Sequence, residues 1–223
     1  EISCSLVGSE MCIRDSGRVR PEQVLAPIYG SAWRYRHRAR LSVREVAKKG
    51  TVLVGFHEKR SSFIADMKSC EILPKRVSDL LVPLRELINS LSLRKKLPQI
   101  ELAVTDEALA LVLRVLEKLT ADDEAKLRQF QKDYGVDFWY QPKGLDSIYP
   151  MDPENATRLK LHHRETGVEV VFRPTDFTQV NHRLNEVMVT RALRLLHLEP
   201  SSKVIDFFCG LGNFTLPLAT RSA

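Results

Sequence analysis

The segment that most constrains the fold is KVIDFFCGLGNF, at positions 203–214. Four apolar residues, two of them β-branched, surround Asp206 and indicate a strand that is covered on both faces. The glycines that follow, Gly210 and Gly212, permit positive φ angles and let backbone approach a ligand closely. A helix that begins near Phe214 would present unpaired N–H groups at the same turn. The order of strand, glycine turn and helix predicts the opening of an α/β cofactor site.

The spacing of this turn favours one kind of ligand over another. The dinucleotide fingerprint requires a third glycine where this chain has Thr215, and an acidic residue about 20 positions further on, so an NAD-dependent enzyme is the poorer fit. The pattern Asp-x-x-Cys-Gly-x-Gly-Asn-Phe suits the S-adenosylmethionine loop of a methyltransferase better. An ordinary strand–turn–helix corner is the alternative interpretation, because one glycine pair is a weak signal by itself.

Composition narrows the class of partner. The 223 residues include 34 Lys or Arg and 28 Asp or Glu, and the net charge of +6 favours an acidic partner, with nucleic acid first. No apolar run approaches the ~18 residues of a transmembrane helix and no secretory signal is recognisable, which predicts a cytoplasmic protein without a membrane partner. Nothing in the sequence predicts a protein partner. The four cysteines lack the regular spacing of a disulfide framework.

Residues 1–16 stand apart from the rest of the sequence. They have neither a helical nor a strand period and do not lead into the segment that follows. We interpret them as a non-native leader, such as a translated sequencing adapter, and exclude them from fold prediction. Cys4 and Cys12 then carry no weight as metal ligands.

Strict alternation predicts a strand over residues 34–44. Apolar residues and His37 occupy the odd positions, and five arginines occupy even positions and would share one face. Because guanidinium forks match phosphate oxygens, this face is the candidate RNA contact. The four arginines that we expect to bind RNA are Arg34, Arg36, Arg38 and Arg40. The alternative is a solvated face on which they pair with acidic residues such as Glu45 or Glu58.

The remaining periodicities predict a central α+β domain at 17–160, followed by the first part of an α/β domain at 161–223. Strands are expected at 51–56, 100–104, 108–115 and 136–141, and helices at 76–93 and from Thr120 to about Lys132. A hairpin at 158–163 and 168–173 and a helix over about 184–196 lead to the glycine turn.

Five segments carry a resemblance to a known family. They are YRHRARL at 35–41, VGFH at 54–57, DMKSCEIL at 66–73, DFTQVN at 176–181 and DFFCGLGNFTLPLA at 206–219. In this order they resemble the RNA uracil-C5 methyltransferases, most closely the bacterial enzymes that methylate 23S ribosomal RNA and carry an iron–sulfur cluster. The resemblance covers about residues 18–221, and its last two segments are the most specific.

The resemblance implies a Rossmann-like methyltransferase domain, S-adenosylmethionine as methyl donor and ribosomal RNA as partner. The cofactor-binding residues that it implies are Gln179, Phe208, Asn213, Asp206, Gly210 and Gly212. In the family the nucleophilic cysteine lies on a later segment, which would fall beyond Ala223, so Cys209 is not the nucleophile. An N-terminal OB-type domain also has no counterpart here, and the chain alone is expected to be inactive.

Cys70 matches the last of four cysteines that hold a [4Fe–4S] cluster in the family. The other three form a Cys-x5-Cys-x2-Cys run ahead of the central domain, where residues 1–16 stand here, so no complete cluster is expected in this chain. The alternative role for Cys70 is that of a small buried hydrophobe.

Two other functions stay open at this point. A tRNA uracil-C5 methyltransferase is disfavoured by the context of Cys70, because the tRNA enzymes of the family generally lack the cluster. A non-catalytic RNA-binding module would explain the arginines, but it has no need for the glycine turn or for Gln179.

Overall fold

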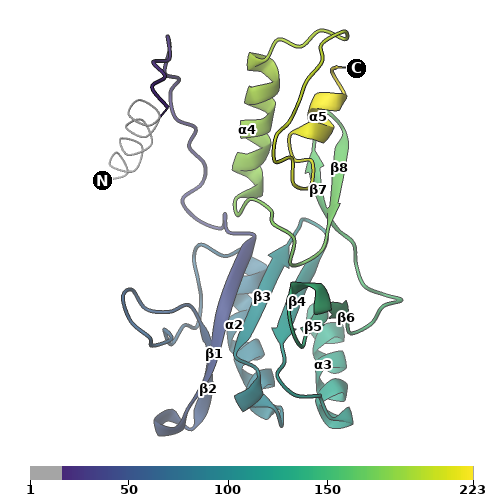
Figure 1. The fold of residues 1–223 in the computed structure, drawn as a ribbon. Helices are drawn as coiled ribbons and strands as arrows, with labels where there is room; N and C mark the ends of the chain where they lie inside the picture. The colour runs from purple at the N-terminus through teal and green to yellow at the C-terminus, as the bar shows by residue number, and fades with distance from the viewer. Residues whose placement is uncertain (1–16, 223) are drawn as a thin grey trace.

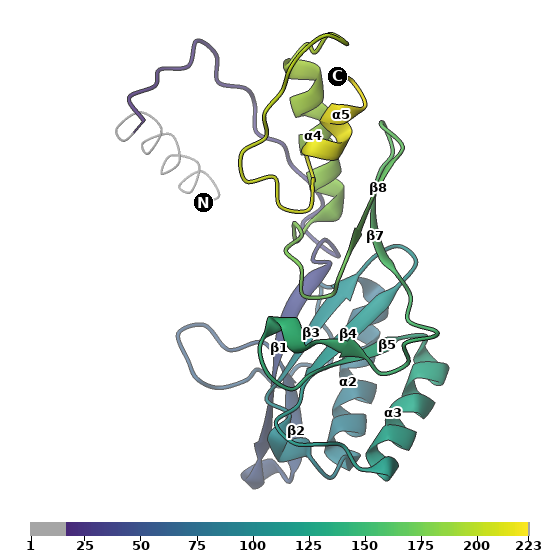
Figure 2. The ribbon, with the colours of Figure 1, turned by 45° about the vertical axis from the view of Figure 1, so that its right-hand side comes forward.

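The computed structural model describes residues 17–222, and its largest part is a six-stranded sheet with two helices on one face (Figures 1 and 2). The strands are β1 (Arg38–Val46), β2 (Thr51–Gly55), β3 (Gln99–Val104), β4 (Leu109–Arg114), β5 (Asp137–Gln141) and β6 (Tyr149–Pro150), in the spatial order β2-β1-β3-β4-β5-β6. All neighbours are antiparallel except β4 and β5, which are parallel because α3 (Ala121–Tyr134) crosses between them. Helices on one face of a mainly antiparallel sheet are the predicted α+β arrangement.

The core lies between the sheet and the two helices. In β1 the odd positions Leu41 and Val43 are buried, whereas Arg40 and Arg44 point to the other face and are exposed. The apolar stripe of α2 (Lys75–Ser90), including Leu81 and Ile88, packs on these buried strand residues. The apolar residues of the strand, with a period of two, and those of the helix, with a period of 3.6, therefore form one core, as the sequence predicts.

The start of α3 is fixed by a capping box. The Thr120 hydroxyl accepts from the Asp123 N–H at 3.1 Å, and the Asp123 carboxylate accepts from the Thr120 N–H at 3.2 Å. The same buried carboxylate accepts from the Ser92 N–H at 2.8 Å and from the Ser92 hydroxyl at 2.6 Å. Asp123 thus ties the start of α3 to the segment that follows α2.

A smaller second part lies at one end of the sheet (Figure 1). It consists of the hairpin β7 (Leu159–His163) and β8 (Val168–Phe172), the helix α4 (His182–Leu195) and the short helix α5 (Thr215–Ala219). Leu159, Leu161, Val170 and Phe172 of the hairpin pack on Ala103 of β3, Ala110 of β4 and Ala108 of the turn between these strands. The predicted domain boundary after residue 160 falls inside β7 and stays a prediction. None of the helices within residues 17–222 is both long and apolar enough to cross a membrane.

Most predicted elements are confirmed to within a few residues, but two are wrong. The first strand begins at Arg38, not at residue 34, because the N–H groups of Arg34 and Arg36 donate to the loop carbonyls of Glu71 and Ile72 at 2.8 and 2.9 Å. The strand expected around Asp206 does not form. No neighbouring strand among the described residues pairs with that segment, and Ile205 is 77% exposed.

Two histidines join the two parts. The ring of His37, just before β1, stacks on that of His182, the first residue of α4, with centroids 4.5 Å apart and planes 16° from parallel. The His37 N–H also donates to the carbonyl of Val180 at 2.8 Å. Burial lowers the pKa of His182 to about 4, with neighbouring His37 and Arg38 acting in the same direction and Asp106 opposing them. Burial also lowers the pKa of His37.

A lower pH is expected to weaken the contact between the two parts at His37 and His182. Because the pKa of His182 is about 4 in the folded state and 6.5 ordinarily, the unfolded state binds more protons between these values. The contribution is complete above pH 6.5 and is lost as the pH falls toward 4, on the order of 3 kcal/mol. Urea unfolding from pH 7 to 4 should show a smaller loss for His182→Phe, which keeps a stacking ring, than for the wild type. The exposed-site control His197→Gln should follow the wild type, and equal losses in all three proteins would contradict the prediction.

Candidate functional site

The predicted glycine turn forms between α4 and α5. Phe208, Gly210 and Gly212 adopt positive φ angles of 63°, 57° and 84°. The Gly212 N–H donates to the Cys209 carbonyl at 2.9 Å, and the Gly212 carbonyl accepts from the Leu216 N–H at 3.0 Å. A Cβ atom on Gly212 would lie 2.8 Å from the Cγ of Leu216. Both the backbone conformation and the space at this position therefore require glycine.

A cavity of about 360 Å³ lies against this turn. Its apolar wall includes Leu161 and Val170 of the hairpin, and the segment after β8 contributes Asp176, Phe177, Thr178 and Gln179. The turn contributes Phe208, Cys209, Gly210, Leu211, Asn213 and Phe214. The size and the mixture of apolar walls with a few polar groups are typical of a small-molecule site.

Four of the six predicted cofactor residues line this one cavity: Gln179, Phe208, Gly210 and Asn213. The side chain of Phe208 is fully exposed at the rim. The other two residues, Asp206 and Gly212, do not line the cavity. Asp206 accepts from the Thr215 hydroxyl at 2.5 Å and so closes the base of the turn, and Gly212 is buried against Leu216. Contact with a bound cofactor stays a prediction for all six.

The cavity has an unsatisfied polar group that sequence analysis did not single out. Thr178 is only 5% exposed, and its hydroxyl oxygen has no hydrogen-bond partner among the described residues. A buried hydroxyl without a partner is costly, so a polar group of a bound ligand would stabilise it. A Cβ atom on Gly210 would meet only the Phe208 carbonyl oxygen, at 4.0 Å, and the residues present fit a ligand with both apolar and polar parts. The only sequence signal for Thr178 is its place inside the DFTQVN segment.

A second missed residue is Asn185 on α4. Its side-chain amide donates to the Asn213 amide oxygen at 2.7 Å and accepts from the Asn213 amide nitrogen at 3.0 Å. It follows the helix cap Asn181 by one turn, on the side of α4 that also buries Val189 and Leu193. A polar residue in this apolar stripe was the available signal.

Three of the four predicted RNA-binding arginines line a second cavity of about 360 Å³: Arg36, Arg38 and Arg40. Phe177 and Thr178 belong to the walls of both cavities. Arg38 donates to the Pro174 carbonyl at 2.9 Å, and Arg40 pairs with the nearly buried Glu101 at 2.6 Å. Glu101 is therefore the acidic partner in place of the expected Glu45 or Glu58.

Arg34 is not on the shared arginine face. Its guanidinium donates to the carbonyls of Cys70 and Leu73 at 3.0 and 3.2 Å and pairs with Glu71 at 2.6 Å. It has a positive φ of 59° and precedes the strand, which breaks the alternation. Its contacts join the start of β1 to the loop before α2.

Cys70 lies in that same loop, half-buried against the core. Its N–H donates to the Ser78 hydroxyl at 2.8 Å. Within residues 17–222 no group of three or more His, Cys, Asp or Glu side chains is arranged to hold a metal ion. The described residues therefore do not form a cluster site, and Cys4, Cys12 and the interpreted leader at 1–16 lie outside them.

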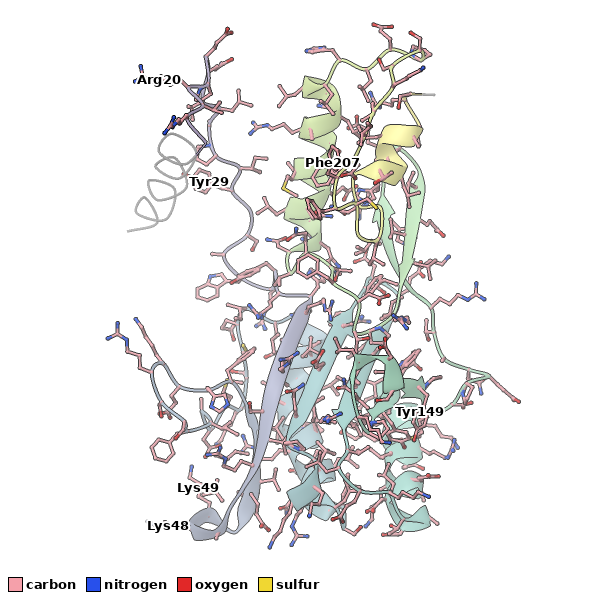
Figure 3. All side chains as sticks on the ribbon, viewed as in Figure 1. Arg20, Tyr29, Lys48, Lys49, Tyr149 and Phe207 are labelled. Carbon is pink, nitrogen blue, oxygen red and sulfur yellow. The ribbon has the colours of Figure 1, made fainter. Side chains whose placement is uncertain are left out.

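The basic turn between β1 and β2 is remote from these cavities. Lys48 and Lys49 lie at the opposite end of the molecule from Phe207, which belongs to the segment leading into the glycine turn (Figure 3). The arginine cavity and the turn cavity, in contrast, adjoin each other through Phe177 and Thr178.

The arrangement of an α+β sheet followed by a hairpin, a helix and a glycine turn has a counterpart among solved structures. The fold is similar to the crystal structure of Pyrococcus abyssi tRNA (uracil-54, C5)-methyltransferase in complex with S-adenosyl-L-homocysteine, with a TM-score of 0.61 and 17% identity. The match covers 85% of this chain and 47% of that one. Because the match covers 85% of this chain, the similarity in fold includes both parts of the chain.

The sequence identifies the family more narrowly. The profile of the tRNA (Uracil-5-)-methyltransferase family matches residues 24–223, and the chain belongs to this family. It is 56% identical to the 23S rRNA (uracil(1939)-C(5))-methyltransferase RlmD of Ralstonia pickettii, 57% to that of Cupriavidus necator and 58% to that of Burkholderia lata. Each match covers 92% of this chain but only 44–46% of the relative, so the chain spans less than half the length of these relatives.

Proposed function

We propose that the protein carrying this chain transfers a methyl group from S-adenosylmethionine to C5 of a uridine in 23S ribosomal RNA. In this proposal the cavity at the glycine turn is part of the methyl-donor site. The observation that carries the proposal is that one cavity joins Gln179 to the turn residues Gly210 and Asn213. Family membership and three relatives named as 23S rRNA methyltransferases support the same reaction. A cytoplasmic location with ribosomal RNA as partner follows from it.

The side chains around the cavity suit the proposed donor. S-adenosylmethionine supplies an electrophilic methyl group on a sulfonium, and it also carries an amino-acid end and an adenosine. The amide of Gln179 has donors and an acceptor for a carboxylate and an ammonium, and the hydroxyl of Thr178 is free to bond either. Leu161, Val170 and Phe214 offer apolar surface for a ring.

Activation of the uracil needs a further group. C5 of uracil becomes nucleophilic when a thiolate adds to C6, and it then takes the methyl group from the sulfonium. A base finally removes the C5 proton, and the thiolate leaves C6. The target base has to leave its stack to reach both groups. Cys209 lines the donor cavity, and Cys70 lies in the loop held by Arg34. We therefore assign the covalent step to neither of them.

A tRNA substrate is the alternative within the family. The family description and the Pyrococcus abyssi enzyme both name tRNA. The relatives at 56–58% identity, however, are named for 23S rRNA, and they favour rRNA for this chain. A non-catalytic RNA-binding module would not need the glycine turn or the cavity beside it.

The full-length gene product is expected to release tritium from 23S rRNA that carries [5-³H]uridine, in the presence of S-adenosylmethionine. Release reports substitution at C5 itself, so it distinguishes this reaction from methylation elsewhere. Unmodified tRNA labelled in the same way serves as the competing substrate. Release from tRNA alone would favour the alternative, and release from neither RNA would contradict a uracil-C5 methyltransferase.

We further propose that Arg38 and Arg40 bind RNA phosphates. Replacing either by Gln should weaken RNA binding across sequences and make the salt dependence shallower by roughly 0.7–0.9 for each phosphate that is no longer neutralised. The matched control is Arg34→Gln, which should lower the unfolding temperature but leave the salt slope unchanged, because Arg34 bonds the loop at 70–73. Filter binding against salt measures the slopes. Unchanged slopes for Arg38→Gln and Arg40→Gln, with lower stability, would assign these two arginines a structural role instead.

We also propose that Cys70 supplies one thiolate to an iron–sulfur cluster whose other ligands lie outside residues 17–222. Full-length protein purified without oxygen is expected to contain iron and sulfide and to absorb visible light, and Cys70→Ser should remove all three signals. Cys209→Ser, at the glycine turn, is the control and should retain them. Wild-type protein without iron would refute the cluster.

A further inference from the structure

We propose that Asn185 is a positioning residue of the methyl-donor site, which acts by clasping Asn213 and so fixing the shape of the glycine turn. The inference rests on the proposed function, because it assigns a role within that site. Its basis is the pair of hydrogen bonds between the two amides, which we call the amide clasp.

The clasp is reciprocal. Asn185 Nδ2 donates to Asn213 Oδ1 at 2.7 Å, and Asn213 Nδ2 donates to Asn185 Oδ1 at 3.0 Å. Each amide therefore gives one N–H and accepts one, and keeps a second N–H. Two bonds between planar groups fix orientation as well as distance. The orientation of the Asn213 amide is thus fixed by Asn185, and Asn213 lines the donor cavity.

One side of the clasp is firmly anchored. Asn185 is 5% exposed and lies one turn beyond the cap of α4, where the Asn181 side chain accepts from the Leu184 N–H at 3.0 Å. Further along the same helix, Val189 and Leu193 pack against Leu218 of α5. The position of Asn185 is therefore set by the cap of α4 and by the packing of this helix on α5.

The other side of the clasp lies in a turn that contains two glycines. Asn213 follows Gly210 and Gly212, which have the widest choice of backbone conformations. Toward solvent, Phe208 contributes no packing because its side chain is fully exposed. The turn is held by the bond between Asp206 and Thr215 at its base, by the backbone bonds of Gly212 to Cys209 and Leu216, and by the amide clasp at its end. Removing the clasp should release the part of the turn that faces the cavity.

The two asparagines depend on each other. Within the described residues the Asn185 amide makes no side-chain hydrogen bond except those to Asn213. A buried amide that loses its partner is strongly disfavoured, so the native packing of α4 selects the turn conformation that restores the pair. Asn213 can therefore serve the site only in the presence of Asn185.

A double-mutant cycle on the full-length gene product tests this coupling by titration calorimetry with S-adenosylmethionine. Asn185→Ala should weaken binding about tenfold, the size expected for the removal of one hydrogen bond. The double variant with Asn213→Ala should bind no more weakly than Asn213→Ala alone. Asn185→Leu, which is similar in size and leaves no cavity, should behave as Asn185→Ala does. Val187→Ala, at a position of α4 that is 49% exposed, is the control and should bind as the wild type.

Two readouts separate positioning from a general loss of structure. The KM for S-adenosylmethionine should rise, while kcat at saturating donor and the affinity for RNA stay unchanged. Without ligand, amide hydrogen exchange should accelerate in residues 209–214 of Asn185→Ala and not in the large sheet. Faster exchange throughout, or equal weakening of RNA binding, would show that Asn185 supports the fold only and would overturn the proposal.

The remaining outcomes are equally decisive. If the wild type binds S-adenosylmethionine and both Asn185 variants bind it equally well, the clasp proposal is wrong and the proposed function stands. If Asn185→Ala weakens binding by the same factor in the Asn213→Ala background, the two residues act independently and the proposal is wrong. If the wild type does not bind the donor, the proposed function itself fails.

Discussion

The contact between the β7–β8 hairpin and three alanines of β3, β4 and the turn between them is the constraint on which the candidate site depends. Ala103, Ala108 and Ala110 present only methyl groups, so the hairpin lies close to the sheet. Leu161 and Val170, on the same hairpin, form a wall of the donor cavity. The stacked rings of His37 and His182 fix α4 relative to β1. The cavity is therefore shaped by contacts between the two parts of the chain as well as by the glycine turn.

The same docking brings the donor cavity and the arginine cavity together. They share Phe177 and Thr178, which lie on the segment between β8 and α4. In the proposed function, a nucleotide held by Arg38 or Arg40 would thus lie next to the methyl donor. In this arrangement β1 and the DFTQVN segment must be neighbours. The hydrogen bond from Arg38 to the carbonyl of Pro174, which lies just before that segment, holds the two together.

Local patterns predicted most of the fold, because alternation and helical periodicity report burial directly. The glycine turn was predictable for the same kind of reason, since its φ angles demand glycine. The failures have a common physical cause. Arg34 lies outside the strand in which it was predicted, and the segment around Asp206 does not form a strand. Both differences arise because strand formation depends on partners elsewhere in the chain. The roles of Asn185 and Thr178 also depend on contacts distant in sequence, so no local pattern could assign them.

The pairing of Arg40 with Glu101 has a consequence for how this surface would hold RNA. The Glu101 carboxylate already pairs with the Arg40 guanidinium at 2.6 Å, and because Glu101 is nearly buried it cannot move far away. A phosphate that binds Arg40 has to share that group or exchange with the carboxylate. Part of the attraction is then offset, and the protein carries its own competitor for the phosphate. In the proposed function, a contact of this kind would form and dissociate with a small net change in free energy and would favour release of the modified RNA over tight retention.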